Sequence, residues 1–395
     1  MESLATPVTG VREIFSLYAQ RYRREHKLPL QHHKTLFALQ HCRTSALGGH
    51  IDQCESCGHK QIFYNSCRNR HCPGCQGLNK IKWMDKLSAN LLPVRYFHIV
   101  FTIPSQLNRL ALVNQKCVYD ILFKAAADSL LTLAKDEKYL HALTGMVAVL
   151  HTWGQNLMEH PHLHTIVPAG GWSEVAQCWK PSRKMFFIPV KVISALFRGK
   201  FLALLKAAYQ AEQFHFEGEI KPLHLKSNFK QLLRTLYNMP WVVYAKKPFQ
   251  NAAHIINYLG RYTHRVAIGN NRIIGIDDDQ VSFKWKDYKD RGKQKVMKLP
   301  AQEFIRRFLL HVLPKGFCKI RYFGIFASRI RKSIMMKCKK AGYIFQKSTF
   351  AGLDWKEVLL LICGIDVSAC PVCKTGKMEL LMTLNRYRAP PYECH

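Results

Sequence analysis

Five cysteines crowd into one short stretch of this 395-residue chain. Cys54 and Cys57 form one C-x-x-C pair, and Cys72 and Cys75 form a second pair after 14 intervening residues. Each pair can hold one edge of a tetrahedron around zinc, so this spacing is a strong signal of a structural zinc site. A closed site of four thiolates leaves no open position for chemistry. We therefore predict a zinc-organised module whose role is to fold and to present its basic residues.

Other potential ligands leave the composition of the zinc centre open. Three of them lie beside the two pairs: Cys67, His71 and His50. They could complete a second site or replace one ligand of the first. A third C-x-x-C pair, Cys370 and Cys373, lies near the C-terminus, where Cys394 and His395 could complete it. A pair of ordinary thiols fits that pattern equally well.

The charge of the chain requires an anionic partner. Lys and Arg number 59 against 26 Asp and Glu, which gives a net charge of +33. Residues 281–347 alone hold 19 Lys and Arg against 3 Asp and Glu, a net charge of +16. No apolar run approaches the roughly 18 residues of a membrane span, and the N-terminus lacks a secretory signal. We therefore expect a cytoplasmic, nucleoid-associated protein that binds nucleic acid rather than membrane.

The periodicity of apolar residues predicts an α+β fold, with a central antiparallel sheet flanked by helices. The expected strands are 94–104, 145–155, 162–170 and 241–247, and residues 272–288 are expected to form a hairpin. The expected helices are 10–45, 79–92, 105–138, 188–213, 227–238 and 249–262. The expected domains are a helical and zinc-binding domain (1–92), the sheet domain (93–270) and a basic C-terminal DNA-binding region (271–395).

Two histidines lie on one of the expected strands, in the sequence His-Pro-His-Leu-His at residues 160–164. Positions i and i+2 of a strand share a face, so His162 and His164 would point together while Leu163 points into the core. Two imidazoles placed in this way form half of a divalent metal site. His160 is a poorer partner, because Pro161 would interrupt the strand ladder. Taken alone, the pattern also fits a histidine-rich turn.

The third ligand of that site is open on the sequence alone. We expect Gln155, on the preceding strand, to reach the face of the histidines across the turn. An oxygen ligand beside open positions suits Mg2+ or Mn2+. His254 is the rival candidate, reaching in from the helix at 249–262, and His151 is a weaker one.

Two tyrosines lie four residues apart on the helix expected at 249–262. Tyr258 and Tyr262 therefore share one helix face, about one turn apart. Aromatic residues at this spacing usually belong to a core, but here they are surrounded by polar and basic residues. Arg261 and Arg265 are suited to contact a phosphate backbone, and so are Arg68 and Arg70 in the cysteine-rich module.

In combination, these motifs resemble the HUH rolling-circle transposases of the insertion-sequence ninety-one group. The resemblance covers nearly the whole chain, including SCRNRHCPGCQ (66–76), HTWGQNLMEHPHLHTIVPAGG (151–171) and YLGRYTHRVAIGNNRI (258–273). His162-Leu163-His164 matches the HUH motif, in which two histidines flank a bulky hydrophobic residue. Tyr258 and Tyr262 match the two tyrosines of the family's Y-x-x-x-Y motif.

The resemblance implies a mechanism and partners. A metal would polarise the scissile phosphate of single-stranded DNA, and a tyrosine hydroxyl would attack it to leave a 5′-phosphotyrosine and a free 3′-hydroxyl. Two tyrosines would hold two strand ends during rolling-circle-like movement of a mobile element, together with a host helicase. The binding targets would be single-stranded DNA and the ends of the element.

Two other classes of protein compete with this interpretation. A non-catalytic zinc protein that binds nucleic acid fits the charge and the cysteines, but it has no need of the histidine strand or the paired tyrosines. A metal-independent tyrosine recombinase requires an H-x-x-R sequence, and none of the 19 histidines is followed by Arg at the third position.

Overall fold

The computed structural model describes residues 10–182, 188–246, 249, 252–263, 266–288 and 290–386. The chain divides into two compact units. We name residues 1–82, 264–312 and 349–395 the ribbon unit, and residues 83–263 and 313–348 the sheet unit. This division differs from the three consecutive domains expected from the sequence. Residues 313–348, which were expected in the basic C-terminal region, belong to the sheet unit.

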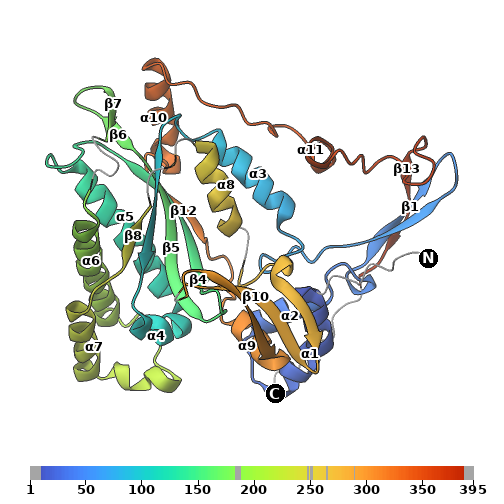
Figure 1. Cartoon of the computed structure of the whole chain (residues 1–395), viewed down its shortest axis with the longest axis horizontal. Coiled ribbons are helices and arrows are strands. Elements are labelled where there is room, and N and C mark those ends of the chain that lie inside the picture. The colour runs from blue at the N-terminus through green and yellow to red at the C-terminus, as the bar shows by residue number, and fades with distance from the viewer. Residues whose placement is uncertain are drawn as a thin grey trace. The chain divides into compact units, whose positions relative to one another are not determined.

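A five-stranded sheet forms the centre of the sheet unit (Figure 1). Its spatial order is β12-β4-β5-β3-β8, and every neighbouring pair is antiparallel. The strands are β3 (Tyr96–Thr102), β4 (Gly145–Trp153), β5 (Glu159–Pro168), β8 (Val243–Ala245) and β12 (Ile320–Gly324). A separate hairpin consists of β6 (Gly170–Ser173) and β7 (Cys178–Pro181). The α+β class with a central antiparallel sheet is therefore confirmed.

Helices cover both faces of this sheet, as Figure 1 shows. One face carries residues such as Phe101, Leu150 and Leu163, which pack with α5 and α6 in the main core. The other face carries Val149 and Ile166, which pack in a second core with α8. The helices of the unit are α4 (Asn108–Val113), α5 (Gln115–Lys135), α6 (Val190–Gln210), α7 (Lys226–Asn238), α8 (Ala252–Thr263) and α10 (Ser328–Lys340), with 3-10 turns η2 (Ser105–Leu107) and η3 (Gly218–His224).

The ribbon unit combines a small helical core with two three-stranded sheets. Its helices are α1 (Val11–Glu25), α2 (Leu30–Gln40), α9 (Ala301–Leu309) and α11 (Trp355–Cys363), with 3-10 turns η1 (Ser45–Leu47) and η4 (Asn270–Arg272). Helix α3 (Gly77–Ser88) leads from this unit into the sheet unit. Phe15 of α1 packs edge-on against Phe308 of α9, with ring centroids 5.1 Å apart.

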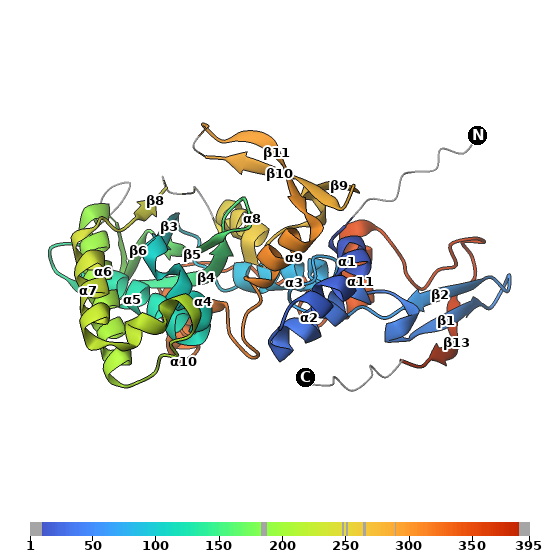
Figure 2. The same cartoon turned by 90° about the horizontal axis from the view of Figure 1, so that it is seen from below.

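The two sheets of the ribbon unit are formed by different parts of the chain. One contains β9 (Ile273–Asp277), β10 (Gln280–Asp287) and β11 (Lys293–Pro300). The other, which we name the terminal ribbon, contains β1 (Gly49–Cys54) and β2 (Lys60–Tyr64) with β13 (Met378–Leu384) paired to the outer edge of β1 (Figure 2). The N-terminal and C-terminal parts of the chain thus share one small sheet.

Several expected elements differ from the observed ones. The helix expected at 10–45 is two helices, because Pro29 fits the N-cap of α2 but not a helix interior. The hairpin expected at 272–288 is present as β9 and β10, and it gains β11 as a third strand. Within the described part of the chain, no helix has the length and apolar character needed to span a membrane.

Candidate functional site

The hairpin of β4 and β5 builds the histidine centre. His162 and His164 lie on one face of β5, and Leu163 points into the main core on the other face, as strand geometry predicts. His151 of β4 lies directly opposite His162 in the strand pairing. All three histidines are buried, and their candidate ligand atoms lie within 4.8 Å of one another. We name these three residues the histidine cluster.

The separation of the two central nitrogens fits a shared metal ion. The Nε2 atoms of His162 and His164 are 3.1 Å apart. Two nitrogens bound about 2.1 Å from one ion at right angles would be about 3.0 Å apart. The two nitrogens are therefore close enough to bind one ion.

Neighbouring acceptors orient both central imidazoles. His162 donates from Nδ1 to the carbonyl oxygen of His160 at 2.6 Å, which leaves its Nε2 as the ligand atom. The Nδ1 of His164 lies 2.9 Å from Nε2 of His98. When His164 donates from Nδ1 to His98, its Nε2 is likewise left as the ligand atom. Such outer contacts fix the tautomer and the ring orientation of metal-binding histidines. His98, on β3, was not predicted from the sequence.

Burial keeps these imidazoles neutral at physiological pH. It lowers the pKa of His164 to about 3. It also lowers the pKa of His98 to about 3, and it holds the pKa of His162 well below its ordinary range. A metal ligand must offer a free lone pair, so these neutral imidazoles are in the state that binds a metal.

The third histidine is His151 of β4, which was the weakest of the three candidates for the third ligand. Gln155 lies in the turn beyond the end of β4, which stops at Trp153. His254 is exposed on α8 and is not part of the histidine cluster. The pairing of β4 with β5 changes register after His151, and this irregularity accommodates Pro161 within β5. The turn from Gly154 to Leu157 places Trp153 opposite Glu159, and the register change then places His151 opposite His162, so no local sequence signal gives this pairing.

Tyr258 lies beside the histidine cluster on α8. The helix packs on this face of the sheet through Ile255 and Leu259, which are fully buried. The ring of Tyr258 lies edge-on to the ring of His98, with centroids 4.9 Å apart. His98 therefore contacts both a candidate metal ligand and the candidate nucleophile.

A lysine holds the hydroxyl group of this tyrosine. Lys246, just after β8, donates from Nζ to the Tyr258 hydroxyl oxygen at 3.1 Å, and Nζ lies 4.7 Å from the centre of its ring. Lys246 was not predicted from the sequence, because it is 12 residues from Tyr258 and belongs to no motif. Tyr262 follows one turn later on α8, but its side chain and that of Arg261 lie outside the described residues, as does Arg265.

Eight of the described cysteines form two four-thiol clusters, both within the ribbon unit, and Cys394 and His395 lie outside the described residues. Cluster A consists of Cys42, Cys67, Cys72 and Cys75, and cluster B consists of Cys54, Cys57, Cys370 and Cys373. The single site expected from Cys54, Cys57, Cys72 and Cys75 is therefore corrected. The expected pairs lie in different clusters because the Cys54 pair follows β1 into the terminal ribbon, beside the chain that leads into β13.

The geometry of cluster A fits one tetrahedral zinc ion. The Sγ atom of Cys75 lies 3.4 Å from that of Cys42 and 3.6 Å from that of Cys67. Zinc–sulfur bonds of about 2.3 Å place the sulfurs of a tetrahedral site about 3.8 Å apart. His71 is buried beside this cluster, but its Nδ1 contacts the Asn69 side chain at 2.9 Å. Cys42 was missed because it lies 12 residues before the first C-x-x-C pair.

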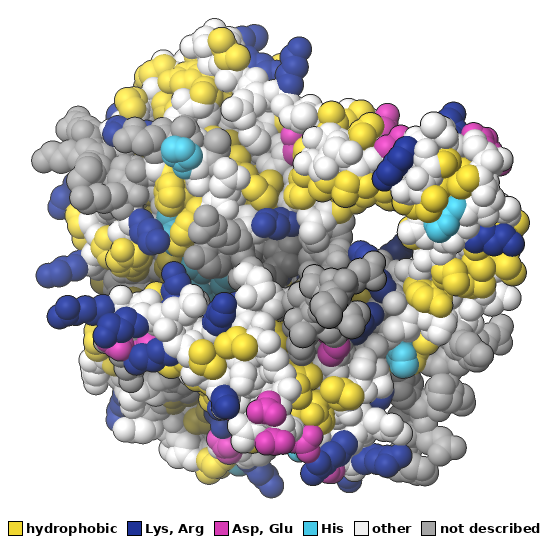
Figure 3. Space-filling view, turned by 45° about the vertical axis from the view of Figure 1, so that its right-hand side comes forward, with side chains coloured by type: hydrophobic (Ala, Val, Ile, Leu, Met, Phe, Trp, Pro, Cys, Tyr) yellow, Lys and Arg dark blue, Asp and Glu magenta, His cyan; other side chains and the backbone are white. Residues whose placement is uncertain are grey.

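Basic side chains lie at exposed positions in both units. Arg68 is exposed and Arg70 is half-buried, both between ligands of cluster A. Exposed lysines line β10 and β11 (Lys284, Lys286, Lys293 and Lys298), and others lie on α10. Figure 3 shows Lys and Arg side chains spread across one face of the molecule, with Asp and Glu confined to a few places. This distribution is suited to a phosphate backbone.

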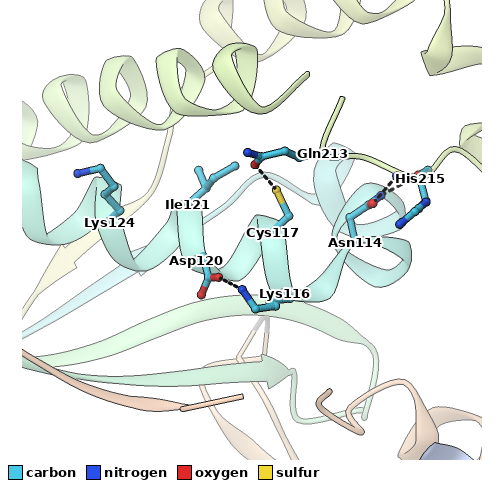
Figure 4. Close-up of a pocket in the computed structure, with 8 residues that line it drawn as sticks. All are labelled: Asn114, Lys116, Cys117, Asp120, Ile121, Lys124, Gln213 and His215. Carbon is cyan, nitrogen blue, oxygen red and sulfur yellow. Dashed lines mark hydrogen bonds and ion pairs between the residues drawn. The ribbon is translucent and has the colours of Figure 1, made fainter. Parts of the chain in front are cut away.

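A surface groove in the sheet unit offers no comparable chemistry. It is lined by Asn114, Lys116, Cys117, Asp120, Ile121, Lys124, Gln213 and His215 (Figure 4). Lys116 is paired with Asp120, and Asn114 is bonded to the backbone at His215. Several of its polar groups thus pair with one another, and its described lining includes no member of the histidine cluster or of the cysteine clusters.

Comparison with known proteins agrees with these features. Residues 14–103 match the family described as "Transposase zinc-binding domain", and residues 145–333 match the family described as "Putative transposase". The chain is 42% identical over 385 residues to "Putative transposase y4qJ" of Sinorhizobium fredii, covering 96% of this chain and 97% of that protein. It is 26% identical over 346 residues to "Transposase for insertion sequence element IS801" of Pseudomonas savastanoi pv. phaseolicola, covering 86% and 81%. No solved structure matches the chain.

The matched regions coincide with the two kinds of candidate centre. The zinc-binding family covers all of cluster A and the first pair of cluster B, and the transposase family covers the histidine cluster and Tyr258. The family match and the cysteine clusters support structural zinc. Together with similarity along nearly the whole chain, they show that this protein belongs to the IS91 family of transposases and carries that family's zinc-binding domain.

Proposed function

We propose that this transposase cuts and rejoins single-stranded DNA, with Tyr258 and Tyr262 as nucleophiles beside a divalent metal. The observation that carries the proposal is the chain of contacts from the histidine cluster through His98 to Tyr258. In this proposal His162, His164 and His151 hold the metal, and His151 takes the position for which the sequence suggested Gln155. Arg68, Arg70, Arg261 and Arg265 are proposed to contact DNA.

The donor set bears on the choice of metal. Three imidazole nitrogens suit a borderline ion better than Mg2+, which prefers oxygen ligands. The phosphate oxygens of DNA would add hard ligands at the open positions, so Mg2+ or Mn2+ fits the complete site, with Mn2+ favoured. When bound, such an ion supplies electrostatic stabilisation of the charge that develops on the phosphate.

The protein's own groups prepare the nucleophile. His98 and α8 hold the ring of Tyr258, and the Lys246 ammonium group lies at its hydroxyl oxygen, where negative charge develops as the proton leaves. The tyrosine oxygen forms a bond to phosphorus, and the bond from phosphorus to the 3′ oxygen breaks. The tyrosine proton passes to solvent, and the departing 3′ oxygen gains a proton to become a hydroxyl group.

The phosphotyrosine retains the energy of the broken phosphodiester bond. A 3′-hydroxyl group can therefore attack it later to rejoin DNA, without a nucleotide cofactor. Tyr262 lies one helical turn from Tyr258, so a second nucleophile on the same helix could hold a second strand end. Lys246 contacts Tyr258, which favours Tyr258 as the residue that cuts first.

A covalent-adduct assay tests the proposal. A labelled single-stranded element end should form a protein–DNA adduct in the presence of Mn2+, and the Tyr258→Phe/Tyr262→Phe double variant should form none. Tyr237→Phe, at an exposed position on α7, is the matched control and should form adducts normally. Persistent adduct in the double variant would exclude these nucleophiles. DNA binding without any adduct in the native protein would favour a non-catalytic zinc protein.

A further inference from the structure

We infer that cluster B binds a second zinc ion, which joins the N-terminal and C-terminal parts of the chain. Its ligands are Cys54 and Cys57 at the end of β1, and Cys370 and Cys373 before β13. The matched zinc-binding domain ends at residue 103, so half of the proposed site lies outside it. This inference does not depend on the tyrosine mechanism.

The sulfur positions fit a tetrahedral zinc site. The Sγ atoms of Cys54 and Cys373 are 3.7 Å apart, and so are those of Cys57 and Cys370. These values match the separation of about 3.8 Å expected for sulfurs bound to zinc at about 2.3 Å. All four sulfurs lie within 4.8 Å of one another. Both close contacts join one pair to the other, so each pair provides one edge of the tetrahedron.

The two pairs also share one backbone turn. The residue after the second cysteine has a positive φ in both, 71° at Gly58 and 64° at Lys374. That residue donates its amide hydrogen to the carbonyl oxygen of the first cysteine, from Gly58 to Cys54 and from Lys374 to Cys370, at 3.0 and 3.1 Å. Two segments more than 300 residues apart therefore present their thiols in the same way.

Contacts with the sulfur atoms complete the site. The amide of Gly376 donates a hydrogen bond to Sγ of Cys373 at 3.3 Å. A Cβ atom at residue 376 would lie 2.4 Å from Sγ of Cys54 and 2.6 Å from the hydroxyl oxygen of Ser56. The close approach of the second pair to the first therefore requires glycine at this position.

The terminal ribbon has too little core to hold itself together. Four of the five residues of β2 are exposed, and β13 has no buried residue. The central strand β1 buries only its end residues, Gly49 and Cys54, so the ribbon buries little apolar surface and is unstable without another source of free energy. Binding of zinc to four thiolates contributes directly to folding, which explains how this ribbon is stable.

Metal analysis of the full-length protein tests the inference. Cys370→Ser/Cys373→Ser should contain one zinc fewer per chain than Cys318→Ser/Cys363→Ser, a control at two exposed cysteines outside both clusters. Cys42→Ser/Cys72→Ser should lose one zinc from cluster A instead. Replacing zinc with cobalt should give thiolate-to-metal absorption that falls by about half in either cluster variant. Equal zinc content in the Cys370→Ser/Cys373→Ser variant and its control would overturn the inference.

A glycine variant keeps all the thiols and separates metal binding from misfolding. Gly376→Ala should release one zinc to a chelator at least about tenfold faster than the native protein, because its Cβ atom displaces Cys54. Gly275→Ala, where a Cβ atom meets nothing within 4 Å, is the matched control and should release zinc at the native rate. Equal release rates for the two alanine variants would also overturn the inference, even if the serine variants fail to fold.

Discussion

The histidine cluster and the cysteine clusters differ in what holds their ligands in place. The histidines come from neighbouring strands of a sheet with buried apolar cores on both faces. The cysteines of cluster B come from turns at the edge of a ribbon with almost no core. The sheet therefore positions its imidazoles without a metal, whereas the ribbon depends on the metal for its own structure.

If both centres bind metal as proposed, this difference separates two roles of metal in one chain. A preformed site with open positions can exchange its ion and admit a phosphate. A closed site of four thiolates retains its ion and can only stabilise structure. The predictions below test whether the two roles can be separated by experiment.

The largest effect is expected from removal of the two central histidines. In His162→Ala/His164→Ala, cleavage of a single-stranded oligonucleotide with Mn2+ should fall about a thousandfold or more, because a catalytic metal supplies several kcal/mol. Zinc content should not change, since cluster A and cluster B keep their thiols. Initial rates measure the loss of cleavage, and mass spectrometry measures the zinc content.

Matched variants identify the third ligand in the same assay. His151→Ala should weaken Mn2+ binding more than Gln155→Ala, and His254→Ala should behave like the native protein, because His254 is exposed on α8. A stronger loss of Mn2+ affinity in Gln155→Ala than in His151→Ala would restore the glutamine as the ligand.

The next largest effect concerns cluster A. Cys42→Ser/Cys75→Ser should release one zinc and unfold the module around α3 and the Arg68 segment, because structural zinc contributes to folding. Binding of element ends should weaken at least about tenfold. Cleavage of a short oligonucleotide in excess should fall less, since the histidine cluster lies in the other unit. Equal losses in both assays would show that the two centres are not separable.

A smaller effect is expected at Lys246. Lys246→Met keeps the length and apolar stem of the side chain but removes the ammonium group from the Tyr258 hydroxyl. Adduct formation should slow by about tenfold to a hundredfold, as expected for loss of one charge-stabilising donor. Affinity for the oligonucleotide should change by less than about threefold, because binding depends on many phosphate contacts. Lys246→Arg should restore part of the rate, whereas an unchanged rate in Lys246→Met would exclude this role.

The smallest effect is a pH dependence of stability in the sheet unit. The pKa values of His98 and His164 are lowered to about 3 by burial, from an ordinary value of 6.5. Between these values the unfolded chain binds more protons, so the full free energy of unfolding is present above about pH 6.5 and declines as the pH falls toward 3. Each histidine contributes up to about 1.4 kcal/mol per pH unit.

Urea unfolding followed by tryptophan fluorescence measures this slope without added Mg2+ or Mn2+. The midpoint should fall between pH 7 and pH 5, and His98→Phe should have a smaller slope than the native protein. A midpoint that is constant over this range would contradict the neutral, buried state of the cluster.

The sequence predicts the sheet unit well, because its signals are local. β-branched and aromatic residues in segments such as 96–102 specify strands, and the His-Leu-His sequence places two imidazoles on one face. His98 was missed, and His151 was ranked below Gln155 and His254, because the roles of both depend on the pairing of strands. The turn after Trp153 and the register of β3 against β5 determine that pairing, and neither can be predicted from the local sequence.

The ribbon unit shows where local signals fail. The spacing of C-x-x-C pairs predicts zinc, but it does not predict which two pairs bind the same ion. A second pair can come from a distant segment as well as from a nearby one. Cys54 and Cys57 therefore seemed to belong with Cys72 and Cys75. The exposed residues of β13 give no amphipathic pattern, so nothing in that segment indicates that it pairs with β1.

The pairing of β1 with β13 also sets an order of events during synthesis. β1 leaves the ribosome early, but its partner strand begins at Met378. At about 5–20 residues per second, the nascent chain waits tens of seconds with one edge of β1 uncovered and with Cys54 and Cys57 lacking their partner thiols. The terminal ribbon can close only around a chain that has been translated beyond Cys373. Chains that terminate before β13 therefore cannot form the terminal ribbon.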